Sequence, residues 1–153
     1  MGEALYIALY FPPVQFGKPM PELELTTTDG QTKKLSDFKG KYILIDFWTS
    51  ECRTCIDAFP ELRSFATEYK DDVSVVSINI DDNQSLWNEA TEQHPVGENN
   101  FYADKNNLTI QQYTGERGAL VQALVSPEGI VLVENWEYPQ GKLTDEFLKI
   151  IHP

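Results

Sequence analysis

Two cysteines lie three positions apart in the segment 42–60, "YILIDFWTSECRTCIDAFP". Cys52 and Cys55 follow an apolar run and open a segment with helical periodicity. A cysteine at such a strand-to-helix junction is expected in the first helical turn, where free backbone N–H groups and the helix dipole favour the thiolate. The spacing leaves Cys55 one turn further on, close enough to form a disulfide after small rotations. The pattern therefore predicts a redox-active pair.

A carboxylate interrupts the apolar run that precedes the cysteines. Asp46 would lack water there, so its pKa should rise and it could act as a proton acceptor. Two other interpretations stay open from the residues alone. The cysteines could be buried thiols without chemistry, because free cysteine is among the most buried residue types. Asp46 could be a structural acid that is hydrogen-bonded within a sheet.

The sequence offers few ligands for a metal ion. A zinc site needs four ligands, and only His94 and His152 could add imidazole to the two cysteines. Neither histidine shows metal-like spacing. We therefore expect no metal site, and no motif calls for another cofactor.

Length and charge restrict the class of protein. The 153 residues suit one domain that can bury a core without disulfide staples, and the net charge of −12 argues against binding to nucleic acid or anionic membranes. No segment approaches the roughly 18 apolar residues of a membrane span, so we expect no membrane insertion. The apolar stretch 4–11 is eight residues long, follows Glu3 and lacks a basic flank, so it does not match a signal peptide.

The hydrophobic pattern predicts an α/β domain that positions the pair. The runs 41–48 and 73–80 are nearly continuously apolar, which is typical of strands covered on both faces, as in a parallel sheet. Four prolines in the segment 11–21 disfavour regular structure, so we expect an irregular arm over 1–15 and the domain over 16–153. The remaining expected elements are a hairpin over 22–35, a helix over 52–70 kinked at Pro60, helices over 83–93 and 104–114, a hairpin over 119–136 and a helix over 142–151.

The segment 43–62, "ILIDFWTSECRTCIDAFPEL", resembles the active-site segment of the thioredoxin superfamily. The approach 17–41 resembles the lead-in of the TlpA/ResA-like branch, which is shared with AhpC/TSA redoxins. The segments 100–114 and 120–132 resemble that branch's insertion, last helix and final hairpin. The resemblance covers the chain from about Phe16 to the C-terminus. The matching residues of the active-site segment are Asp46, Phe47, Trp48, Cys52, Cys55 and Pro60.

This resemblance implies a thioredoxin-like fold, with a central mixed sheet flanked by helices and an added N-terminal hairpin. It also implies thiol–disulfide exchange with protein partners, in which Cys52 attacks a substrate disulfide and Cys55 resolves the mixed disulfide. Asp46 matches the buried acid that relays a proton, and Trp48 matches an aromatic that packs beneath the site. The substrate-binding residues that we expect are Trp48, Glu51, Ala119 and Leu120. Members of this branch are exported, so the resemblance implies a periplasmic or other extracytoplasmic location.

One departure from the family pattern precedes the first cysteine. Glu51 stands where the family has an aromatic residue. Its negative charge opposes formation of the Cys52 thiolate, whereas Arg53 on the other side favours it. Glu51 also makes the expected docking surface charged rather than apolar.

A second departure concerns the loop that faces the cysteines in the family. The family's Gly-Ile-Pro-Thr becomes 118–121, Gly-Ala-Leu-Val, so Leu120 stands where a cis-proline is usual. A cis bond before a residue other than proline costs on the order of 3 kcal/mol, so we predict a trans bond between Ala119 and Leu120. The substrate groove that these residues line should then differ from that of the family.

Two alternatives to a thiol–disulfide oxidoreductase follow. A catalytically weak or inactive thioredoxin-like binding domain of a larger surface protein is favoured by Glu51 and Leu120. Peroxide reduction is suggested by Thr49-x-x-Cys52, but Ile45 stands where a peroxiredoxin has proline. The patterns specify no oligomeric state.

Overall fold

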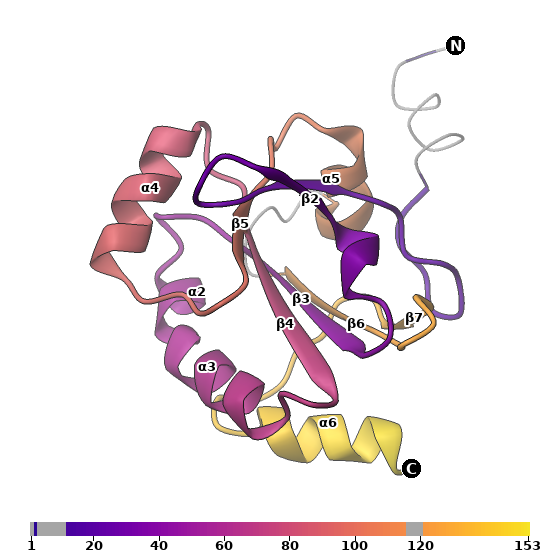
Figure 1. Ribbon diagram of the computed structural model, residues 1–153. Coiled ribbons are helices and arrows are strands. Elements are labelled where there is room, and N and C mark those ends of the chain that lie inside the picture. Colours follow the sequence, from indigo (N-terminus) through magenta and orange to yellow (C-terminus); the bar gives the residue numbers. More distant parts are fainter. Residues whose placement is uncertain (1, 3–11, 116–120) are drawn as a thin grey trace.

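A mixed sheet of seven strands runs through the middle of the molecule (Figure 1), with the strand order β2-β1-β5-β4-β3-β6-β7. The structure is a computed structural model that describes residues 2, 12–115 and 121–153. The strands are β1 (Glu24–Thr26), β2 (Thr32–Lys34), β3 (Tyr42–Trp48), β4 (Val73–Asn79), β5 (Asn100–Tyr102), β6 (Val121–Val125) and β7 (Val131–Val133). The helices are the 3-10 helix η1 (Leu35–Phe38) and the α-helices α2 (Arg53–Asp57), α3 (Phe59–Glu68), α4 (Gln84–Gln93), α5 (Leu108–Thr114) and α6 (Leu143–Ile151).

The central strand β3 lies parallel to β4 and antiparallel to β6. β5 continues the parallel part of the sheet next to β4, whereas β1 pairs antiparallel with both β5 and β2. The predicted α/β fold with a mixed sheet and an added N-terminal hairpin is therefore confirmed. In the hairpin, Gly30 has a φ of 84°, which suits glycine at the turn between β1 and β2.

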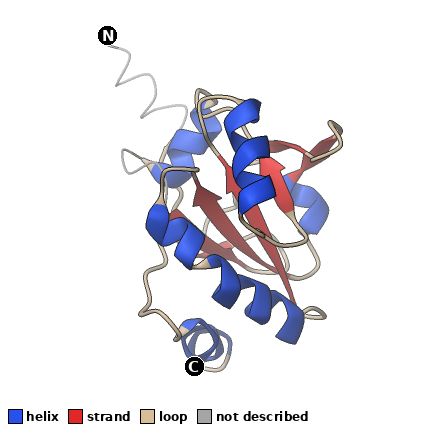
Figure 2. Cartoon of the chain, turned by 90° about the vertical axis from the view of Figure 1, so that its left-hand side faces the viewer, coloured by secondary structure: helices blue, strands red, loops and turns tan. Residues whose placement is uncertain are grey.

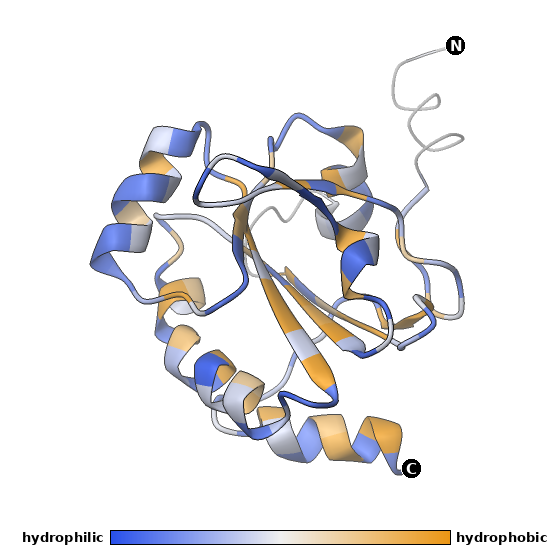
Figure 3. Ribbon diagram, viewed as in Figure 1, coloured by the Kyte–Doolittle hydropathy of each residue, from blue (hydrophilic) through white to orange (hydrophobic). Residues whose placement is uncertain are grey.

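Helices cover both faces of the sheet (Figures 1 and 2). Side chains alternate between the faces of a strand, so Ile43, Ile45 and Phe47 of β3 join one core cluster and Leu44 and Trp48 join the other. The first cluster includes residues of η1 and α5, and the second includes residues of α2, α3, α4 and α6. β3 and β4 are mostly coloured as hydrophobic in Figure 3. Strands that are covered on both faces need such nearly unbroken apolar runs.

Two sequence predictions differ from the structure. The expected helix over 52–70 is divided into α2 and α3 at Ala58, because Pro60 cannot donate a backbone hydrogen bond to the preceding turn. Strand β5 lies in a segment for which we predicted only a loop and a later helix, and α5 begins at Leu108 rather than near 104. Three residues are too short for their periodicity to be recognised, and the pairing of β5 with β4 is what makes them a strand.

Part of the N-terminal segment contacts the domain. The Val14 N–H donates to the Gln112 carbonyl at 2.8 Å, and the Gln112 side chain donates to the Pro12 carbonyl at 3.0 Å. Val14 is buried in the core cluster that includes α5. In the part of the chain that the structure describes, no helix has the length and apolar character needed to cross a bilayer.

The packing of α6 generates a stability prediction. Phe147 is fully buried, and its ring packs edge-on against Tyr42 and Phe65, with centroids 5.5 Å and 5.2 Å away. We expect Phe147→Ala to lower the free energy of unfolding by about 3–5 kcal/mol, because it removes this ring and leaves a cavity. Urea denaturation measures the change. Phe16→Ala is the matched control, since Phe16 is 71% exposed, and equal losses in the two variants would contradict the assignment of this core.

Candidate active site

A disulfide joins Cys52 and Cys55 directly after the central strand, with their Cα atoms 5.3 Å apart. Cys52 is the N-cap of α2, one position earlier than the first turn in which we expected it. Its Sγ accepts a hydrogen bond from the Cys55 N–H at 3.2 Å. A backbone N–H aimed at this sulfur would stabilise the thiolate in the reduced pair.

The two sulfurs differ in their access to solvent. Cys52 is half-buried, whereas Cys55 is 0% exposed. The Cys55 Sγ lies 3.9 Å from the Phe47 carbonyl oxygen, at the end of β3. A second molecule can therefore approach the Cys52 sulfur more readily than that of Cys55.

Asp46 lies in the sheet on the face that α2 covers. It shares this face with Leu44 and Trp48, and the cluster they form contains Cys55. Asp46 is 1% exposed and lies opposite Ser77 of β4 and Gln122 of β6. The Ser77 hydroxyl donates to its Oδ2 at 3.4 Å and the Gln122 amide to its Oδ1 at 3.2 Å.

Burial raises the pKa of Asp46 to about 7, although the two hydrogen bonds act in the opposite direction. The carboxyl group is thus bonded within the sheet and also titrates near neutral pH. The two interpretations of Asp46 from sequence are therefore compatible. A group with this pKa can both accept and return a proton at physiological pH.

Gln122 and Tyr138 belong to the surroundings of Asp46, and sequence reasoning missed them. The Tyr138 hydroxyl donates to the Gln122 Oε1 at 2.5 Å, and burial raises the pKa of Tyr138. An aromatic residue at position 138 does not by itself indicate such a role. The available signal was Gln122, a polar residue inside the apolar run of β6, as Asp46 is inside that of β3.

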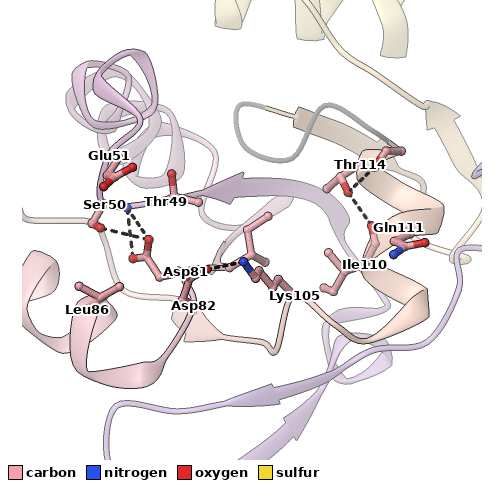
Figure 4. Close-up of a pocket in the computed structure, with 12 residues that line it drawn as sticks. Thr49, Ser50, Glu51, Asp81, Asp82, Leu86, Lys105, Ile110, Gln111 and Thr114 are labelled. Carbon is pink, nitrogen blue, oxygen red and sulfur yellow. Dashed lines mark hydrogen bonds and ion pairs between the residues drawn. The ribbon is translucent and has the colours of Figure 1, made fainter.

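Asp81 holds the loop that leads to the cysteines. Acids at the end of a strand usually face water, but Asp81 is only 6% exposed. Its carboxylate accepts from the Ser50 N–H at 3.0 Å and from the Ser50 hydroxyl at 3.1 Å (Figure 4). It also accepts from the Asn79 amide at 2.9 Å. These bonds fix the backbone two residues before Cys52.

A pocket of about 380 Å³ lies beside this loop (Figure 4). Ser50 and Glu51 line it on one side and residues of α5 on the other, and an ion pair between Lys105 and Asp82 crosses between them. Glu51 is exposed. The pocket therefore carries charged and polar groups, and Glu51 of its lining immediately precedes Cys52 in the chain.

Of the other predicted site residues, the structure describes Trp48 but not Ala119 or Leu120. Trp48 is fully buried and packs edge-on against Phe59, with ring centroids 5.1 Å apart, so it supports the site from within the core. Its indole N–H has no hydrogen-bond partner in the part of the chain that the structure describes. Ala119 and Leu120 lie outside the described residues, and so does the bond between them.

Arg53, on the other side of Cys52 from Glu51, has a partner of its own. Its Nε lies 3.2 Å from the Asp57 carboxylate, one helical turn further along α2, and both side chains are largely exposed. Arg53 therefore offsets the effect of Glu51 on the Cys52 thiolate less than expected, because Asp57 partly neutralises the Arg53 charge.

Comparison with known proteins agrees with this geometry. A family model described as Redoxin matches residues 15–144. A thiol-disulfide oxidoreductase ResA from Bacillus thuringiensis subsp. konkukian is 26% identical over 145 residues, which cover 92% of this chain and 80% of that protein. The thioredoxin-like protein YneN from Bacillus subtilis is 35% identical over 67 residues, a match that spans 44% of this chain and 39% of YneN.

Solved structures show the same fold. The thioredoxin domain of a thiol-disulfide oxidoreductase from Bacteroides vulgatus superposes with a TM-score of 0.79 at 25% identity, covering 91% of this chain and 99% of that one. A putative thiol:disulfide interchange protein DsbE from Chlorobium tepidum gives a TM-score of 0.78 at 24% identity, with 90% and 99% covered. The chain therefore belongs to the Redoxin family, within the thioredoxin superfamily, and has ResA-like thiol–disulfide oxidoreductases among its relatives.

Proposed function

We infer that the protein is a thiol–disulfide oxidoreductase that exchanges disulfides with protein substrates through Cys52 and Cys55. One observation carries this inference: a disulfide with one accessible and one buried sulfur lies on the same face of the sheet as a buried carboxyl group whose pKa is about 7. Thiol–disulfide exchange needs an attacking thiolate, a resolving thiol and a place for the proton. The thiol–disulfide oxidoreductases among its relatives support the same activity.

In the direction of substrate reduction, we propose that the Cys52 thiolate attacks a substrate disulfide. A bond forms between the Cys52 sulfur and one substrate sulfur, and the other substrate sulfur leaves with the electron pair. The Cys55 sulfur then attacks Cys52, giving the disulfide of the oxidised protein and releasing the second substrate thiolate. In this scheme the Asp46 carboxylate accepts the proton from the Cys55 thiol. Oxidation of a substrate dithiol runs through the same steps in reverse.

Substrate contact is proposed for Glu51 and for the residues Ala119 and Leu120. Glu51 is exposed beside Cys52, where an incoming protein must approach. Its charge favours substrates that present basic or polar groups near the target cysteine. Trp48 is proposed to act indirectly, by supporting α2 from the core.

We also propose an extracytoplasmic location, which rests on the resemblance to exported TlpA/ResA-like proteins. Protein thiols and disulfides are the proposed partners. The division into an arm over 1–15 and a domain over 16–153 is likewise proposed, and the family match that begins at residue 15 supports it.

The first prediction concerns the cysteines. Cys52→Ser should abolish reduction of a protein disulfide such as that of insulin, whereas Cys55→Ser should accumulate a trapped mixed disulfide with the substrate, because no resolving thiol remains. Alkylation followed by mass spectrometry distinguishes these species, and urea denaturation checks that both variants fold. In glutathione redox buffers the wild-type pair should convert reversibly between about −270 and −120 mV.

Two outcomes would contradict this function. Full activity of Cys52→Ser would remove the nucleophile from the scheme. A pair that stays locked as a disulfide, or stays reduced, across all buffers would instead favour the thioredoxin-like binding domain.

The second prediction concerns Asp46 and stability. Its pKa is about 7 in the folded protein, above the ordinary value of 3.8, so the folded state holds this proton more tightly than the unfolded state. The associated stability is fully present below about pH 4 and is lost as the pH rises through 7. Between pH 5 and pH 8, the wild type should lose about 3 kcal/mol more unfolding free energy than Asp46→Asn.

Urea denaturation of the oxidised protein at both pH values measures this difference. Asp104→Asn is the control, because Asp104 is exposed. If the Asp46→Asn variant differed from the wild type by the same amount at pH 5 and pH 8, the folded-state pKa of Asp46 would not be raised.

A further inference from the structure

The hydrogen bonds of Asp46 do not end at the carboxyl group. Gln122 lies directly opposite Asp46 in the pairing of β3 with β6, and the Gln122 Nε2 donates to the Asp46 Oδ1 at 3.2 Å. The second bond, from Ser77 on the opposite strand β4, is longer at 3.4 Å. Gln122 therefore provides the shorter of these two hydrogen bonds to the buried acid.

Tyr138 binds the end of the Gln122 amide that does not face Asp46. The Tyr138 hydroxyl donates to the Gln122 Oε1 at 2.5 Å. If the amide were turned around, its oxygen would face the Asp46 carboxylate and its NH₂ group the Tyr138 hydroxyl, so the acid would keep only the Ser77 donor. The observed orientation satisfies both ends of the amide.

The backbone holds Gln122 as well. Gln122 lies in β6, and its backbone carbonyl accepts from the Trp136 N–H at 2.7 Å. The Trp136 ring packs edge-on against the Tyr138 ring, with centroids 5.1 Å apart. The segment that follows β7 is thus anchored to β6 at the level of Asp46.

This network ends at the surface beside the active-site helix. Gln122, Trp136 and Tyr138 line a groove of about 390 Å³ together with Thr54 and Ala58. Thr54 lies between the two cysteines in sequence, and Ala58 joins α2 to α3. A substrate bound to Cys52 would therefore lie close to the Tyr138 end of the network.

Few titratable groups face Asp46. Tyr138 is linked to it through Gln122 from the segment after β7, and the cysteine pair lies on the same face from α2. Glu61 of α3 acts on Tyr138 and lines the same groove. From β4 the neighbour is the uncharged Ser77.

We propose that Gln122, held in place by Tyr138, is a positioning residue that orients the Asp46 carboxyl group and stabilises its ionised form during the resolving step. This proposal rests on the function proposed above. In this proposal, Gln122 and Tyr138 determine the pH range in which Asp46 can take the proton from Cys55. Neither residue touches the reacting sulfurs in this scheme.

The physical reason is the cost of a charge in the core. Burial disfavours the ionised carboxyl group, and the Gln122 N–H partly offsets that cost. Without this donor, the pKa of Asp46 should rise further above 7, and the carboxylate needed to accept the Cys55 proton should form only at higher pH. Removing a hydrogen bond to a charged group changes the pKa of that group by about one unit or somewhat more.

The test uses Gln122→Met, which keeps the length of the side chain but removes the donor, and Tyr138→Phe, which removes one oxygen atom. The reduced proteins are mixed with oxidised glutathione between pH 5.5 and 9.5, and the mixed disulfide on Cys52 is trapped by alkylation over time. We expect the midpoint of the resolving rate to move alkaline by about one pH unit in Gln122→Met and by less in Tyr138→Phe.

Tyr113→Phe is the matched control. Its buried hydroxyl donates to the Pro21 carbonyl, and its ring packs on Phe47 from the other face of the sheet. This variant should keep the wild-type midpoint. A merely structural role for Gln122 would lower the rate at every pH and leave the midpoint in place, which would overturn the proposal. Should Gln122→Met fail to fold, an unchanged midpoint in Tyr138→Phe would overturn it.

Failure of the proposal can be distinguished from failure of the function on which it rests. If Asp46→Asn loses the pH dependence near 7 but Gln122→Met keeps the wild-type midpoint, Asp46 acts as proposed and Gln122 does not position it. If Asp46→Asn keeps the wild-type profile, the role of Asp46 itself is wrong. If no mixed disulfide forms on Cys52 in the wild type, the exchange function is wrong.

Discussion

The position of β3 in the sheet is the constraint on which the rest of the structure depends. It pairs with β4 on one side and β6 on the other, and helices cover both of its faces. All its residues after Tyr42 are buried, so the strand has no freedom to shift or tilt without disturbing both core clusters. Because Cys52 follows the end of this strand by only a few residues, a rigid β3 gives the disulfide a fixed place.

The same burial makes Asp46 unusual. A carboxyl group in the interior is costly when ionised, and among the described residues the hydrogen-bond partners of Asp46 are a hydroxyl and an amide rather than a cation. A cation would lower its pKa and hold it ionised at all physiological pH values. Neutral donors leave the pKa near 7, where the group can change its protonation state during a reaction cycle. The ionised carboxyl group lowers the free energy of unfolding at neutral pH, and in return the face of the sheet that α2 covers carries a titratable group.

Features that depend on residues close together in the sequence could be predicted, whereas features that depend on distant residues could not. The run of β3, the Cys52–Cys55 spacing and the polar residue at position 46 are local patterns, and the structure contains the strand, the disulfide and the buried acid. Trp48 was expected beneath the site and is buried there. β5 escaped recognition because three residues carry too little periodicity, and their pairing with β4 involves residues more than twenty positions away.

The partners of the site were harder to predict for the same reason. Acids at the end of a strand usually face water, but Asp81 accepts from the N–H and the hydroxyl of Ser50, 31 positions away in the chain, and from the nearby Asn79 amide. Tyr138 gave no local signal, because its partner Gln122 is 16 residues away and on the other side of a hairpin. Contacts of this kind depend on register and loop path, which hydrophobic periodicity does not contain.

Two sets of polar contacts therefore hold the active site from opposite sides. Asp81 fixes the loop before Cys52, and Gln122 with Tyr138 fixes the acid beneath Cys55. Glu61 adds a third restraint, because its carboxylate accepts from the Gly141 and Leu143 N–H groups and so ties α3 to the start of α6. Groups held by buried hydrogen bonds lose little further entropy when a substrate arrives. We therefore expect the redox change to be confined to the two sulfurs and the proton that accompanies them, while the fold around them stays in place.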